Sequence, residues 1–174
     1  MRDMTEREEL VRTVLQAAGG KITGRIRLQK MLYLLEQLGL GGGFQFSYHN
    51  YGPYSEDLAR ALERATILDK TIQEEKKAFV GGGGFYSIYS LTNNDDPLPE
   101  KIGGITVEAA QAHIRAMKDT TSVVIELAAT IHWLREKEKV GDWCSELKIR
   151  KGSKAQDESI NKAEALLQGL GLAA

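Results

Sequence analysis

Four consecutive glycines at positions 81–84 separate two runs of residues that favour extended backbone. Residues 71–80 and 85–91 carry β-branched and aromatic side chains, which pack well on a pleated surface. Two such runs joined by a short glycine-rich stretch predict a β-hairpin with a flexible tip. The hairpin constrains the fold because three helical patterns precede it, an order typical of a winged-helix-like unit.

The three helical patterns lie at residues 5–18, 24–38 and 55–68, where apolar residues recur every three to four positions. Glycines follow the first two patterns, and Ser55 is a suitable N-cap for the third. Phe44, Phe46 and Tyr48 alternate with polar residues, which predicts a short extended segment before a turn at Gly52-Pro53.

Residues 93–105 contain two prolines and a glycine pair, and we interpret them as a linker. Beyond them the periodicity is purely helical, apart from a polar connector at 141–153. The sequence therefore predicts a mainly α protein with a small β-hairpin, of the α+β class. A winged-helix-like unit at 1–92 is expected to pack against a helical unit at 106–174 in one compact globule.

Charge and cysteine content exclude several classes of protein. The 23 Lys and Arg residues nearly balance 24 Asp and Glu residues, so no bulk charge attracts the chain to nucleic acid or anionic lipid. No stretch approaches the roughly 18 apolar residues of a spanning helix, and the first residues are charged where a signal peptide would be apolar. A single cysteine, Cys144, favours a reducing compartment, and we expect a cytoplasmic protein without membrane association.

Three segments carry a family resemblance. Residues 24–35 read GRIRLQKMLYLL, residues 48–55 read YHNYGPYS and are followed by Leu58, and residues 127–131 read LAATI. Together they resemble the YwgA-like family of bacterial and archaeal proteins, and more distantly the Panacea domain of SocA-like antitoxins. The resemblance implies a winged-helix-like fold and a regulatory or defence context without enzymatic activity, and it supplies no catalytic residues to carry over.

Arg25, Arg27 and Lys30 lie in the first two turns of the second predicted helix. Cations at a helix N-terminus oppose the helix dipole, at a cost of about 0.3–1 kcal/mol each when exposed. The cluster therefore needs a compensating anion. One interpretation is a binding surface for a phosphate or an acidic partner; the other is an internal salt-bridge network, for example to Glu56, Asp57 or Glu63.

A second group of candidate binding residues surrounds Gly52-Pro53. Tyr48, His49, Tyr51 and Tyr54 combine aromatic rings with hydrogen-bonding groups, a combination suited to binding a peptide or a base. The alternative is that these rings anchor the loop on the neighbouring helices, and we favour packing for Tyr51 and Tyr54.

No sequence motif indicates catalysis. The glycine clusters lack the helix and the lysine-serine pair of a phosphate-binding loop, and no histidine stands in a metal-ligand motif. We therefore predict no catalytic residue, no cofactor and no bound metal. His132 is interpreted as a structural helix residue, and a nucleophilic role for Cys144 is disfavoured because no histidine lies near it in sequence.

The charge of the third helix argues against conventional DNA binding. Residues 54–70 hold four acidic and three basic side chains, the wrong balance for a helix that enters a major groove. We expect a non-enzymatic binding or regulatory module, antitoxin-like or defence-associated, that acts through a protein partner. The alternative is a winged-helix DNA-binding transcriptional regulator. We expect association with nucleic acid to be weak at most, and the sequence is compatible with either a monomer or a homodimer.

Overall fold

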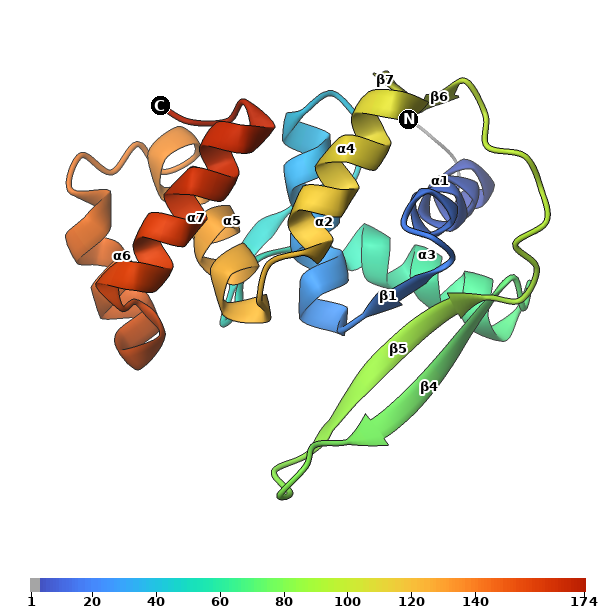
Figure 1. Ribbon diagram of the computed structural model, residues 1–174, viewed down its shortest axis with the longest axis horizontal. Helices are drawn as coiled ribbons and strands as arrows, with labels where there is room; N and C mark the ends of the chain where they lie inside the picture. The colour runs from blue at the N-terminus through green and yellow to red at the C-terminus, as the bar shows by residue number, and fades with distance from the viewer. Residues whose placement is uncertain (1–3) are drawn as a thin grey trace.

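The computed structural model describes residues 4–174, and within them a mainly α, α+β fold is confirmed. This part of the chain contains seven α-helices and three small antiparallel sheets (Figure 1). The helices are α1 (Met4–Ala17), α2 (Arg25–Gln37), α3 (Glu56–Ile67), α4 (Val107–Lys118), α5 (Ser122–Glu136), α6 (Trp143–Lys151) and α7 (Asp157–Leu170), with a 3-10 turn η1 (Gly152–Lys154). The strands are β1 (Lys21–Thr23), β2 (Ser47–His49), β3 (Gly52–Tyr54), β4 (Ile72–Ala78), β5 (Phe85–Leu91), β6 (Lys101–Ile102) and β7 (Ile105–Thr106).

The predicted hairpin is present as β4 and β5, which pair along their whole length from Ile72↔Leu91 to Ala78↔Phe85. Strand β1, which the sequence pattern did not predict, adds to β5 on its other side, so the sheet has the order β1-β5-β4. The base of the hairpin is buried against α1, α2 and α3, whereas its outer half projects beyond the helices (Figure 1).

The segment before α3 differs from the prediction. Strand β2 begins at Ser47 instead of Phe44, and it pairs with β3 at Tyr48↔Pro53. Gly52 and Pro53 therefore lie in a strand, and Asn50 and Tyr51 form the turn. The predicted N-cap is confirmed, because the Ser55 side chain accepts a hydrogen bond from the Leu58 amide at 3.2 Å.

The second half contains further elements that the sequence pattern did not predict. The expected polar connector at 141–153 is helix α6, whose N-cap Asp142 accepts a hydrogen bond from the Ser145 amide. The expected linker at 93–105 ends in the two-residue strands β6 and β7, and Ile102 and Ile105 are buried. These residues are more than a linker, since their side chains join the hydrophobic core.

A single hydrophobic core runs through helices on both sides of residues 93–105. Helix α5 lies at its centre, packed on α2 and α7, and Leu127 is fully buried. Because both halves share this core, side chains from α2 contact α4 and α5 directly. Within residues 4–174, no helix is long and apolar enough to cross a membrane.

Candidate functional site

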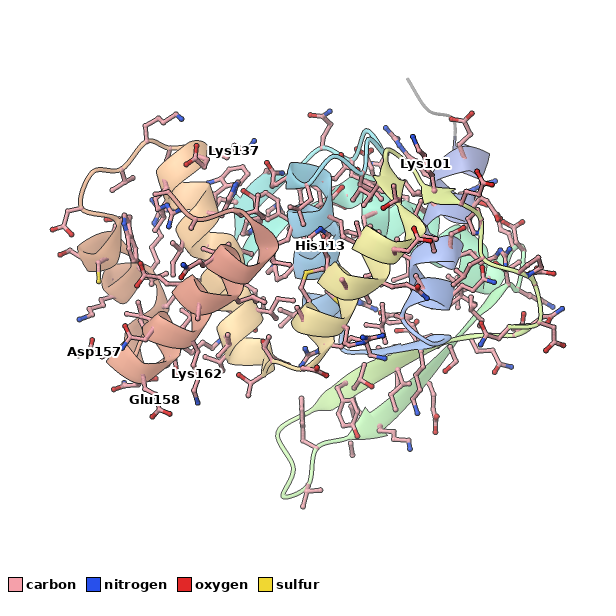
Figure 2. All side chains as sticks on the ribbon, turned by 45° about the horizontal axis from the view of Figure 1, so that its top comes forward. Lys101, His113, Lys137, Asp157, Glu158 and Lys162 are labelled. Atoms are coloured by element: carbon pink, nitrogen blue, oxygen red, sulfur yellow. The ribbon has the colours of Figure 1, made fainter. Side chains whose placement is uncertain are left out.

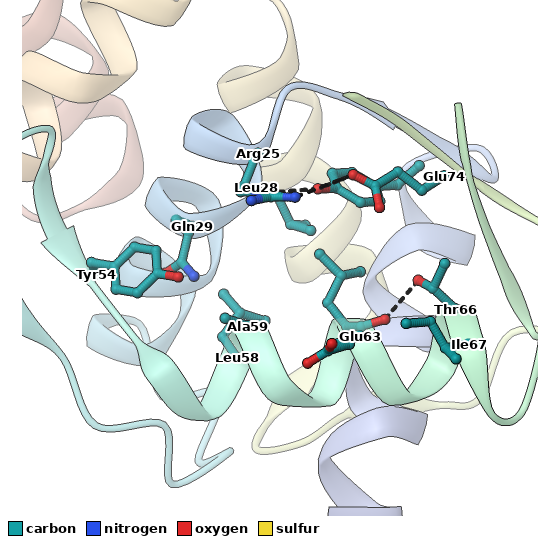
Figure 3. Close-up of a pocket in the computed structure, with 12 residues that line it drawn as sticks. Arg25, Leu28, Gln29, Tyr54, Leu58, Ala59, Glu63, Thr66, Ile67 and Glu74 are labelled. Atoms are coloured by element: carbon teal, nitrogen blue, oxygen red, sulfur yellow. Dashed lines mark hydrogen bonds and ion pairs between the residues drawn. The ribbon is translucent and has the colours of Figure 1, made fainter. Parts of the chain in front are cut away.

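The three cations predicted at the start of α2 leave the helix in different directions. Arg25 is exposed; its Nε donates to Tyr89 Oη at 3.2 Å, and its Nη2 lies 3.2 Å from Glu74 Oε1 (Figure 3). Partial burial opposes ionisation of Glu74, but a hydrogen bond from Ser87 Oγ and the charge of Arg25 outweigh it and lower the pKa of Glu74. Arg25 is thus tied to the base of the hairpin.

Arg27 binds the end of another helix instead of an anion. Its Nη1 donates to the carbonyl oxygens of Met117 at 3.0 Å and Thr120 at 2.9 Å, at the C-terminus of α4. A cation there is favourable, because the last carbonyls of a helix lack partners and carry partial negative charge. Arg27 therefore caps the C-terminal end of α4 and links α2, in the first half of the chain, to α4 in the second half.

Lys30 is buried, with 1% of its surface exposed, and its Nζ donates to the Pro53 carbonyl at 2.7 Å. Burial lowers the pKa of Lys30 to about 8. The prediction that the three cations form one binding surface is therefore wrong, because Lys30 is inaccessible and Arg27 is occupied by carbonyls. The internal partners suggested on α3 are also wrong, since Arg25 pairs with Glu74.

Lys30 belongs to a buried charge cluster centred on Glu126 of α5, which we call the Glu126 cluster: Glu126, Lys30, Lys151 and Lys154. Glu126 lies 3.0 Å from Lys151 Nζ and 3.1 Å from Lys154 Nζ, and its side chain is only 4% exposed. One carboxylate thus faces three ammonium groups, because Lys30 also interacts with it electrostatically. Lys151 Nζ reaches the Asn50 carbonyl at 3.4 Å as well, so the cluster holds the β2–β3 turn against α5 and α6.

The aromatic loop packs onto this cluster. The guanidinium of Arg150 lies 4.7 Å from the centre of the Tyr48 ring, which also neighbours Trp133 at 6.3 Å. Lys154 Nζ lies 5.0 Å from the ring of Tyr51, which is 51% exposed. Tyr48 is therefore a packing residue, whereas half of the Tyr51 surface remains open to solvent.

His49 and Tyr54 stack on each other, with ring centres 4.8 Å apart. His49 Nε2 also lies 3.0 Å from Ser47 Oγ. Tyr54 lines a small pocket of about 300 Å³ between α2, α3 and the hairpin (Figure 3). Arg25 and Glu74 close one side of this pocket, so two predicted binding residues, Arg25 and Tyr54, share it.

A larger groove, of about 840 Å³, lies on the other side of Arg25, and we call it the hairpin groove. It runs between the outer half of the hairpin and the start of α2. Its walls combine the aromatic residues Phe79, Phe85 and Tyr86 with the cations Lys76 and Arg25. The remaining lining residues are Thr23, Gly24, Ile26, Arg27, Ser87 and Ser122.

The hairpin tip beside this groove is unusually apolar for an exposed segment. Phe79, Val80 and Phe85 are 49%, 106% and 71% exposed. The Phe79 and Tyr86 rings contact each other with centres 5.3 Å apart, and both line the hairpin groove. Large apolar side chains gathered on a surface usually mark an interaction site.

Neither the role of the hairpin tip nor that of Glu126 was predicted from the sequence. A signal for the tip is present, because Phe79-Val80 and Phe85 flank the glycine run where polar turn residues are usual. Glu126 is also conspicuous as one carboxylate in the apolar stretch 123–131. Residues 148–154 contain four basic side chains, most of which form ion pairs within the protein: Lys148 pairs with Asp157 and Arg150 pairs with Glu138.

Neither the histidines nor the cysteine form a reactive cluster within residues 4–174. No group of three or more metal-ligating side chains occurs there. His132 is buried and its Nδ1 lies 2.8 Å from Tyr33 Oη; burial lowers the pKa of His132 to about 4. His113 lies on α4 (Figure 2), and Cys144 is a free, partly exposed cysteine on α6.

Two curated proteins are similar to this chain, although no protein-family model matches it. The uncharacterised protein YwgA of Bacillus subtilis is 28% identical over 155 residues, which cover 86% of this chain and 90% of YwgA. A DNA ADP-ribosyl glycohydrolase of Thermus aquaticus is 29% identical over 137 residues, which cover 75% of this chain but 36% of that protein. The chain thus spans most of YwgA and about a third of the glycohydrolase.

Proposed function

This chain is YwgA-like, and on that premise we propose that it is a non-enzymatic cytoplasmic binding module that holds a protein partner at the hairpin groove. The observation that carries the proposal is the apolar tip, where Phe79, Val80 and Phe85 are 49%, 106% and 71% exposed. Exposing such side chains to water is unfavourable, at about 25 cal/mol per Å² of apolar surface. A partner that covers the tip removes this cost.

The groove has the composition of a hot spot for protein binding. Binding energy concentrates on a few buried aromatic and arginine side chains, and the groove offers Phe79, Phe85 and Arg25 together. Glycines 81–84 all have positive φ and meet no neighbouring atom where a Cβ would stand. The tip can therefore adjust to a partner while the base of the hairpin stays anchored.

Helices α1, α2 and α3 are followed by the β4–β5 hairpin, and β1, which lies between α1 and α2, completes the sheet β1-β5-β4; this arrangement supports a winged-helix-like description of the first half. The hairpin then corresponds to the wing, and α3 to the helix that a DNA-binding relative would place in the major groove. On α3, however, Arg64 is paired with Glu8, and Glu56 and Glu63 are exposed. This charge distribution favours a protein partner over the alternative, a DNA-binding transcriptional regulator.

The similarity to the Thermus aquaticus protein supports a modular role. Because the match covers 36% of that protein, a domain of this kind can be one part of a larger chain whose name describes an enzyme. A binding module fits such an arrangement, since it can bring a partner to another domain. The antitoxin-like or defence-associated context in our proposal comes from the more distant resemblance to Panacea domains.

Affinity capture with the full chain tests the proposal. The wild type is compared with the double variant Phe79→Ser/Phe85→Ser. The matched control is Ile149→Ser on α6, because Ile149 is 77% exposed and does not line the hairpin groove. We expect a protein that wild type and control retain and that the double variant loses. If the double variant retains the same protein as the wild type, the proposal is wrong. Sequence-specific binding of duplex DNA with nanomolar affinity at physiological salt would also contradict it.

A further inference from the structure

The two neighbours of strand β5 differ in length. Strand β4 pairs with all seven residues of β5, whereas β1 pairs with only three of them, at Lys21↔Ser90, Ile22↔Tyr89 and Thr23↔Ile88. Beyond this pairing, the Gly24 amide donates to the Ser87 carbonyl at 2.7 Å, and the chain then turns away into α2. Gly24 thus occupies the position beside Ser87, and residues 85 and 86 of β5 have no strand beside them on this side.

The main-chain groups of Phe85 point toward that open side. In an antiparallel sheet the N–H and C=O of one residue face the same neighbour, and this direction alternates along the strand. The Ser87 carbonyl faces β1, because Gly24 donates to it. Gly84 faces β4, because its carbonyl accepts a hydrogen bond from the Phe79 amide at 3.0 Å. The main-chain groups of Phe85 therefore face the hairpin groove, those of Ser87 face Gly24, and those of Tyr86 face β4.

The hairpin groove lies along this open edge, since Phe85, Tyr86 and Ser87 all line it. An extended segment placed there would continue the line of β1 beyond Gly24 and would span about 7 Å beside Phe85 and Tyr86, at roughly 3.3 Å per residue. Its side chains would alternate between the aromatic wall and solvent. Addition of a strand to an exposed sheet edge is a common way in which domains bind peptides.

The charge of the groove specifies the segment further. Its lining includes the cations Arg25, Arg27 and Lys76 and no aspartate or glutamate. Arg25 is paired with Glu74, whereas Arg27 and Lys76 have no carboxylate partner in the groove. Arg27 uses neutral carbonyls as partners, so its positive charge is not cancelled. The groove also meets the positive N-terminal end of α2, where Gly24 provides no side-chain cap. An acidic segment is therefore complementary.

The outer edge of β4 is a poorer site for strand addition. Its residues Glu75, Lys76 and Lys77 are exposed and carry charges of both signs. Charged side chains along an edge strand, lysines above all, discourage pairing with another chain. The open edge of β5 carries aromatic residues instead, with Phe85 71% exposed.

From these observations we propose that an extended acidic and apolar segment of the protein partner adds to β5 as a short strand, in line with β1. The inference rests on the proposed function, because it assumes that the hairpin groove holds a protein. It adds the backbone geometry and the chemical class of the bound segment.

Amide exchange with a model segment tests this inference directly. The probe is a short peptide of alternating valine and glutamate, added to the full chain and followed by NMR. At saturation we expect exchange of the Phe85 amide to slow at least tenfold, while the Tyr86 amide, already directed at β4, changes little. If the peptide binds without slowing the Phe85 amide, or does not bind, strand addition is wrong.

Modified peptides and charge variants sharpen the test. In an added strand, the amides of every second peptide residue face β5 and the others face away. N-methylation of the amides that face β5 should weaken binding at least tenfold, whereas N-methylation of the others should have little effect. Lys76→Glu should weaken binding several-fold, whereas Lys77→Glu, which lies outside the groove lining, should not. Equal effects of the two methylated sets, or of the two variants, would contradict the inference.

The outcome is separable from that of the proposed function. If partner capture depends on Phe79 and Phe85 but the Phe85 amide stays unprotected in the complex, the function holds and strand addition fails. If capture does not depend on the tip, the proposed function itself fails. Concentration-dependent dimerisation that protects the same amide would assign the edge to a second copy and overturn the acidic-partner inference.

Discussion

Replacement of Glu126 by glutamine should be the most destabilising conservative change in the molecule. The carboxylate is 4% exposed and lies 3.0 Å from Lys151 Nζ, whose side chain is 2% exposed. Glutamine keeps the size of the side chain but removes the negative charge, so Lys151 and Lys30 remain buried without a counter-charge. Breaking a buried pair in this way typically costs about 3–5 kcal/mol.

This loss is large compared with the total stability of a domain, which is usually about 5–15 kcal/mol. Lys154 should contribute less to it, because its side chain is 39% exposed and can turn to water. At roughly 2–4 °C per kcal/mol for a chain of this length, we expect the Tm to fall by about 10 °C. Urea unfolding at pH 7, fitted with a common m-value, measures the free energy of unfolding directly.

Two comparisons isolate the charge effect. Glu136→Gln makes the same change on the same helix, but Glu136 is 45% exposed and pairs with Lys139 at the surface, so its cost should stay within about 0.5 kcal/mol. Adding Lys151→Met to Glu126→Gln removes the uncompensated charge and should recover about 1–3 kcal/mol. A loss below about 1 kcal/mol for Glu126→Gln, or no recovery in the double variant, would refute the reasoning.

Further predictions concern pH, backbone and core. Because burial lowers the folded-state pKa of His132 from 6.5 to about 4, its contribution to stability is complete above pH 6.5 and is lost as the pH falls toward 4; His132→Asn should flatten this acid limb in urea titrations. Burial likewise lowers the pKa of Lys30 from 10.5 to about 8, so wild type should gain stability relative to Lys30→Met as the pH rises from 8 to 10.5, and parallel curves would contradict this. Gly52→Ala should destabilise more than Gly82→Ala, since both have positive φ but only at Gly52 would a Cβ stand 2.7 Å from another side chain; equal Tm changes would exclude the clash. Leu127→Ala should cost about 2–5 kcal/mol in chemical denaturation, because the side chain is fully buried, and a cost below about 1 kcal/mol would show that the site collapses around the cavity.

The sequence by itself determined the elements with strong local signals. Helices α1, α2, α3, α4, α5 and α7 follow from apolar residues spaced three to four apart, and the β4–β5 hairpin follows from two β-rich runs around residues 81–84. Weakly patterned elements could not be predicted in this way. Strand β1 has three residues and β6 and β7 have two each, and α6 has too few apolar residues to show a stripe.

Only the tertiary structure decided what the charged residues do. Arg25, Arg27 and Lys30 lie close together in sequence, yet their partners are Glu74, the end of α4 and Pro53. These partners stand 23 to 93 positions away along the chain. No local pattern encodes such contacts, because packing brings these groups together. The packing of distant elements around the shared core therefore determined which of these cations are exposed and which are buried. It also determined that the hairpin groove is open to solvent.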